Sequence, residues 1–195
     1  MDLSPAPRGD GPAGPVLETE RLILRPTRVE DFEGWAAFAA DVESMRFMGG
    51  AQPRPVAWRA FGLMAGSWTL YGFGMFSLIE KTTGRWLGRL GPWRPDGWPG
   101  NEIGWGIVRD AWGRGIAFEA AVAAIDWAFA TLGWQDVIHC IDDQNERSRA
   151  LAHRLGSSWL RRVVLPPPLG QEVDAFGQTR AAWRARPAQG GRLPR

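Results

Sequence analysis

Two glycines, Gly113 and Gly115, stand one residue apart where a strand pattern ends and a helical pattern begins. The first N–H groups of a helix have no acceptor within it, and the helix terminus carries the equivalent of about +0.5 charge. A Cβ at either glycine would hold an anion away and disfavour a positive φ, and Arg114 between them can add a full positive charge. The segment therefore predicts either an anion site, suited to a phosphate, or a glycine-rich loop that allows close strand–helix packing.

The residues that commonly act as nucleophiles or metal ligands are scarce. His139 and Cys140 are neighbours on a predicted strand, so their side chains point to opposite faces and cannot form a nucleophile–base pair. The other histidine, His153, is fourteen residues away and there is one cysteine, which leaves no zinc-type ligand spacing. The serine-hydrolase and Walker motifs are absent, and the Gly104-Trp105-Gly106 run has Arg109 where a dinucleotide fingerprint needs its third glycine. We expect no metal.

Length and composition indicate one globular α/β or α+β domain. The chain has 195 residues, of which 45% are hydrophobic and 23% charged. A single cysteine excludes an intrachain disulfide, and neither a membrane span nor a signal peptide is recognisable, so we expect a cytoplasmic protein. The net charge of +2 is small for a nucleic-acid binder, so we expect no nucleic-acid partner.

Hydrophobic periodicity divides the chain into a domain at 17–183 between Pro/Gly-rich tails at 1–16 and 184–195. Thr27-x-x-Glu30 predicts a capping box at the start of the first helix. Asn145 is expected to cap the last helix, which ends at Gly156. The expected helices are 28–45, 56–69, 116–132 and the one after Asn145; the expected strands are 17–25, 73–80, 85–91, 102–109, 136–141, 159–165 and 173–179.

The glycine loop resembles a known family motif. Trp112 to Ala117 is similar to motif A of the GNAT acetyltransferases, [QR]-x-x-G-x-[GA], with Trp112 in the Gln/Arg place. That tryptophan departs from the general motif, but WGRGIAFEA is similar to the branch that contains the ribosomal-protein N-terminal acetyltransferases. Further similarities to the branch span 17–183: LETERLILRP at 17–26, NEIGWGI at 101–107, DWAF at 126–129 and Asn145-x-x-Ser148.

The resemblance implies a mixed α/β GNAT fold and acetyl-CoA as co-substrate. Its mostly antiparallel sheet would be flanked by helices and splayed between the fourth and fifth strands, 102–109 and 136–141. The backbone at the splay would hold the pantetheine, and the loop amides would hold the pyrophosphate. Asn145 would contact the cofactor arm, although a plain helix cap is the alternative role. The implied cofactor-binding residues are Trp105, Gly106, Ile107, Gly113, Arg114, Gly115, Ile116, Ala117, Phe118 and Asn145.

Catalytic groups are less clearly marked. Several relatives have a glutamate five places before the asparagine and a tyrosine seven after it, but Cys140 and Ala152 stand there in this chain. Ser148 is the candidate proton donor to the leaving thiolate, or a polar residue of a first helical turn. Glu102 is the candidate base, or a solvated strand-end carboxylate.

The expected reaction is transfer of acetyl from acetyl-CoA to a primary amine. The acceptor could be a protein N-terminus, as the branch resemblance implies, or a small amine such as an amino acid, polyamine or antibiotic. An α-amine with pKa ~7.7–8.0 needs less help from a base than a lysine with pKa ~10.4. An acyl-CoA-binding sensor without turnover is the alternative, and homodimer formation is left open.

Overall fold

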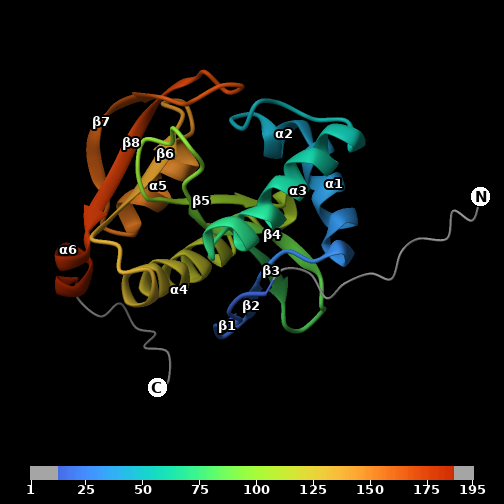
Figure 1. Ribbon diagram of the computed structural model, residues 1–195, viewed down its shortest axis with the longest axis horizontal. Helices are drawn as coiled ribbons and strands as arrows, with labels where there is room; N and C mark the ends of the chain where they lie inside the picture. The colour runs from blue at the N-terminus through green and yellow to red at the C-terminus, as the bar shows by residue number, and fades with distance from the viewer. Residues whose placement is uncertain (1–12, 187–195) are drawn as a thin grey trace, which may run out of the picture.

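The computed structural model describes residues 13–186, which form one eight-stranded sheet with helices on both faces (Figure 1). The strand order is β1-β2-β3-β4-β5-β6-β8-β7. The strands are β1 (Leu17–Glu18), β2 (Leu22–Arg25), β3 (Phe76–Glu80), β4 (Trp86–Trp93), β5 (Glu102–Ile107), β6 (Asp136–Ile141), β7 (Ser158–Val164) and β8 (Glu172–Thr179). The helices are α1 (Phe32–Ala40), α2 (Val42–Met45), α3 (Arg54–Tyr71), α4 (Ile116–Thr131), α5 (Glu146–Arg154) and α6 (Arg180–Ala185), with 3-10 turns at Val29–Asp31 and Arg109–Ala111. Among these described helices, none is long and apolar enough to cross a membrane.

Alternation along the strands explains the two layers of helices. The neighbours Trp86 and Leu87 on β4 belong to different core clusters, because successive side chains point to opposite faces. Leu87 packs in the cluster that α4 covers, and Trp86 packs in the cluster formed by α1 and α3. The expected mixed α/β fold is confirmed.

The sheet splits between β5 and β6. These two strands are parallel and share one register pair, Glu102 with Ile138, whereas every other neighbouring pair is antiparallel. Beyond that pair the strands diverge, at the place predicted for the splay. The carbonyl of Ile103 accepts from His139 across the gap. Because alternate residues of a strand direct their backbone groups to the same side, those of Trp105 also face the gap.

The first predicted strand and helix are each divided in the structure. The strand expected at 17–25 is interrupted between β1 and β2, where the N–H of Thr19 donates to the carbonyl of Leu22. The helix expected at 28–45 breaks at Asp41, whose extended backbone ends α1 and whose side chain caps α2.

Local capping and the end of the domain also differ from expectation. The capping box predicted at Thr27 and Glu30 is wrong: Asp31 accepts from the N–H of Arg28 instead, and the buried Thr27 hydroxyl has no partner. Asp31 takes the capping role predicted for Glu30 because its carboxylate also pairs with buried Arg25 and is held in that position. At the other end, α6 was not predicted, and it continues two residues past the expected boundary at 183.

Candidate active site

A cleft of about 1260 Å³ follows the splay between β5 and β6. One end, the glycine-loop end, is lined by the turn at Gly113 to Phe118 and by α5. The other, the carboxylate end, surrounds Glu102; its lining includes Trp35, Phe38, Met75, Arg89 and Trp98. Trp105, at the middle of β5, lies between the two ends.

The glycine loop has the backbone conformation that its sequence predicts. Gly113 and Gly115 have φ of 73° and 77°, and Gly115 caps α4. Within the described chain, no hydrogen bond uses the N–H groups of residues 113–118. A helix terminus with free N–H groups and no Cβ at its glycines is suited to an anion such as a pyrophosphate.

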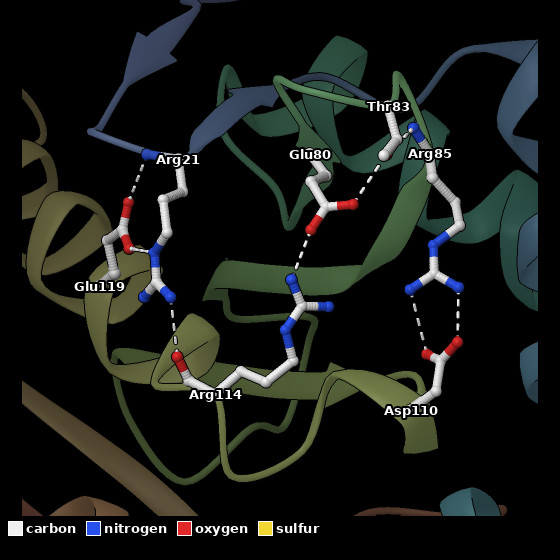
Figure 2. Close-up of polar contacts among 7 residues, drawn as sticks. All are labelled: Arg21, Glu80, Thr83, Arg85, Asp110, Arg114 and Glu119. Carbon is white, nitrogen blue, oxygen red and sulfur yellow. Dashed lines mark hydrogen bonds and ion pairs between the residues drawn. The ribbon is translucent and has the colours of Figure 1, made fainter.

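The Arg114 side chain does not serve this site in the expected way. Its guanidinium is 2.6 Å from the Glu80 carboxylate (Figure 2), and Arg114 does not line the cleft. The expectation that its charge adds to the anion site is therefore wrong, and its backbone N–H is what it can offer. The loop folds this way because β3 supplies an acidic partner at that position.

Ion pairs fix the outer side of the loop to the sheet (Figure 2). Arg21 is 2.6 Å from Glu119 in the first turn of α4 and donates to the carbonyl of Arg114 at 2.8 Å. Arg85 pairs with Asp110, which precedes the glycines. These contacts are half-exposed, so each adds little stability. Together they hold the loop so that its inner side faces the cleft.

Ser148, the candidate proton donor, lies on the cleft lining beside Trp105. The indole N–H of Trp105 donates to the Ser148 hydroxyl at 3.1 Å. Because an indole is only a donor, the serine oxygen accepts and its own proton is free to be donated. Asn145 accepts from the Ser148 N–H, so it is a helix cap, and its amide NH₂ remains available on the cleft lining.

Glu102 is buried, which excludes the solvated strand-end role. Its two carboxylate oxygens accept from the indole N–H of Trp98 and from the N–H of Cys140. Burial raises the pKa of Glu102 to about 7, against the opposing effects of these two donors and of the Arg89 charge. A carboxylate with a pKa near neutrality in a cleft is a candidate general base.

Comparison with known proteins agrees with this geometry. Residues 21–158 match the family model of the acetyltransferase (GNAT) domain. The chain belongs to the GNAT acetyltransferase family. A Bacillus licheniformis protein named uncharacterized N-acetyltransferase p20 is 31% identical over 143 residues, which are 72% of this chain and 80% of the relative.

Solved structures show the same fold. An acetyltransferase from Agrobacterium tumefaciens is 31% identical, with a TM-score of 0.75, covering 85% of this chain and 95% of that one. Mycobacterium smegmatis RimJ, solved in complex with CoA-disulfide, has a TM-score of 0.63 at 16% identity. The match covers 85% of this chain and 87% of the RimJ chain. GNAT enzymes use acetyl-CoA, and the free loop amides of this acetyltransferase fit that co-substrate.

Two arginines of α5, Arg147 and Arg154, line the cleft beside the glycine loop of the acetyltransferase. Their guanidinium carbons are 4.6 Å and 4.0 Å from the ring centroids of Trp112 and Phe118, and both line the cleft. Neither arginine was predicted from the sequence to lie beside the loop. The two arginines are seven residues apart, so the sequence indicates that they lie on one face of the helix. Their contact with the loop depends on how α5 packs against α4, which the sequence does not show.

The buried histidine has a structural role in the acetyltransferase. The Nδ1–H of His139 donates to the carbonyl of Ile103, so Nε2 accepts from the Ser157 hydroxyl. Burial lowers the pKa of His139 to about 4 despite that carbonyl contact, and the ring is neutral at pH 7. It packs 4.8 Å from the Trp105 ring and supports that residue at the splay.

Proposed function

We propose that this acetyltransferase transfers acetyl directly from acetyl-CoA to an α-amine held at the carboxylate end of the cleft. The observation that carries the proposal is the buried Glu102 on the same strand as Trp105, whose free backbone groups would hold the pantetheine. The free amides of Gly113 to Phe118 would hold the pyrophosphate.

The chemistry balances with the groups present. Glu102 accepts one proton from the acceptor ammonium, and the neutral amine nitrogen then attacks the thioester carbonyl carbon. A C–N bond forms, the C–S bond breaks, and the second nitrogen proton passes to solvent. The Ser148 hydroxyl would donate a proton to the leaving thiolate and recover one from solvent. No tyrosine is needed at the position that Ala152 occupies.

The pKa of Glu102 supports an α-amine rather than a lysine. Proton transfer from an ammonium of pKa ~8 to a base of pKa about 7 costs roughly 1.4 kcal/mol, whereas a lysine at pKa ~10.4 costs about 4.6 kcal/mol. A protein N-terminus, as the branch resemblance implies, carries such an amine. A free amino acid also carries an α-amine, but its own carboxylate favours the protonated form unless that carboxylate is paired.

An acceptor panel tests this function. Each acceptor is supplied with acetyl-CoA, and the released thiol and the acetylated product are measured. The acceptors are peptides with alanine or serine at the N-terminus, amino acids, polyamines and Nα-acetyl-lysine amide, whose only amine is the ε-amine. We expect release equal to product for α-amine acceptors and at least tenfold less for lysine-type amines. Binding of acetyl-CoA with no release for any amine would instead identify a non-catalytic acyl-CoA sensor.

Replacing Ser148 by alanine tests the proton donor. We expect turnover to fall about 10- to 100-fold, at the lower end of acid–base contributions, while the dissociation constant of acetyl-CoA changes less than about threefold. Ser148→Thr keeps the hydroxyl and should recover most of the rate. Unchanged turnover in Ser148→Ala would remove Ser148 from the mechanism.

A further inference from the structure

Arg89 is a guanidinium without a carboxylate partner at the carboxylate end of the cleft. It lies on β4, opposite Gly106 of β5. Its described polar contacts are two thioether sulfurs, Met75 Sδ at 2.7 Å and Met48 Sδ at 3.7 Å, and its Nε is buried with no acceptor. The Trp35 ring centroid is 5.3 Å from its central carbon.

A structural role alone does not account for these contacts. Thioethers are weak acceptors, and a half-buried charge without strong partners, with a buried Nε that has no acceptor, is costly. Buried Arg25 shows the alternative in the same chain: its two terminal nitrogens donate to Asp31 at 2.8 Å each. Burial lowers the pKa of Arg89 to about 10, partly opposed by the charge of Glu102, so Arg89 stays protonated at pH 7.

The flexible side chain of Met75 lies between Arg89 and Glu102. The sulfur of Met75 contacts the guanidinium. Its methyl group lies over Gly104, where an added Cβ would be 2.6 Å from the methyl and 3.4 Å from a Glu102 oxygen. Methionine is unbranched and adapts easily, so a ligand can displace it. A ligand in that place would have a cation at one end and a carboxylate at the other.

The geometry points to a free α-amino acid as the acceptor, with its carboxylate bound by the Arg89 guanidinium and its amine next to Glu102. This assignment rests on the proposed acetyl transfer and narrows its substrate class. An arginine guanidinium can donate two parallel hydrogen bonds to the two oxygens of one carboxylate, which a lysine ammonium cannot do. The aromatic and thioether lining at Trp35, Phe38 and Met48 favours an apolar side chain on that amino acid.

Binding to Arg89 also helps the chemistry. The carboxylate of a free amino acid is a negative charge beside the amine, and it favours the protonated amine. Pairing with Arg89 offsets that charge and favours the neutral nucleophile. A peptide N-terminus has no carboxylate at this distance, so it would leave Arg89 unpaired.

Matched acceptors test the assignment. L-Methionine and L-phenylalanine are compared with L-methioninol and L-phenylalaninol, which keep the side chain and the amine but lack the carboxylate. For the wild type we expect kcat/KM to be about 10- to 100-fold higher with each amino acid than with its alcohol, as for a charge-assisted bidentate contact. In Arg89→Met this ratio should approach one, and in Arg89→Lys it should be intermediate.

A second arginine provides the control. Arg54 also lies over an aromatic ring, at 4.6 Å from the Phe32 centroid, but it is exposed and pairs with Glu33. Arg54→Met should keep the wild-type ratio. The dissociation constant of acetyl-CoA, measured for Arg89→Met, checks that the variant is folded. A wild-type ratio near one would overturn the assignment. An equal loss of kcat/KM with the amino acid and with its alcohol in Arg89→Met would also overturn it. If no amine at all were acetylated, the proposed function would fail instead.

Discussion

Replacing Gly113 by aspartate is expected to weaken acetyl-CoA binding about 10- to 100-fold relative to replacing it by asparagine. Gly113 has φ of 73°, a conformation that both residues tolerate, and no atom lies within 4 Å of an added Cβ. The two variants therefore share shape and backbone strain and differ in charge. A carboxylate a few ångströms from the pyrophosphate costs roughly 1–3 kcal/mol at partly exposed sites. Calorimetric titration with acetyl-CoA measures the difference.

The choice of Gly113 rather than Gly115 follows from the structure. A Cβ at Gly115 would lie 3.5 Å from Nη2 of Arg21, so an acidic side chain there could pair with that arginine instead of opposing the phosphates. Equal affinities of Gly113→Asp and Gly113→Asn would contradict the assignment of the loop, because any loss common to both variants is explained by the backbone alone.

Glu102→Gln is expected to lower kcat/KM about 100-fold at about pH 6.5 to 7, where Glu102 is partly ionised and most of the acceptor amine is still protonated, because a general base typically contributes 10²–10⁴-fold. The amide cannot accept the ammonium proton. Its NH₂ must also face one of two donors, the Trp98 indole or the Cys140 N–H, which now both donate to the carboxylate. We therefore expect a loss of about 1–3 kcal/mol in unfolding free energy as well, measured by thermal or denaturant melting.

Glu43→Gln is the control for Glu102→Gln. Glu43 is an exposed carboxylate on the lining of the same cleft, so its neutralisation changes the local charge without removing a buried base. We expect kcat/KM within about threefold of the wild type. A comparable loss in both variants would mean that cleft charge, not proton transfer at Glu102, limits the rate.

Much of the site could be predicted from the sequence because it depends on local backbone chemistry. The spacing of Gly113 and Gly115 before an apolar helical stripe fixes a positive-φ turn and free N–H groups, and the structure has both. Asn145 was recognised as a helix cap for the same reason. Hydrophobic alternation likewise located the strands on both sides of the splay.

The remaining features depend on contacts between segments far apart in the chain. Arg114 points away from the cleft because Glu80, 34 residues earlier, pairs with it. The burial of Glu102 depends on Trp98 folding over it and on β6 at Cys140. Arg89 is one arginine among 23 Lys and Arg residues, and no local pattern shows that it lacks a carboxylate partner.

The central claim, that Glu102 removes the proton from the acceptor amine, is tested most directly by the pH dependence of kcat/KM. Burial raises the pKa of Glu102 to about 7, and the residue accepts a proton only when ionised, so the rate should rise with pH through a midpoint near 7. Ionisation of the acceptor amine adds a second rise at higher pH. In Glu102→Gln the lower step should disappear while the upper one remains. The same lower step in both proteins would contradict the account, because the titrating base would then be another group.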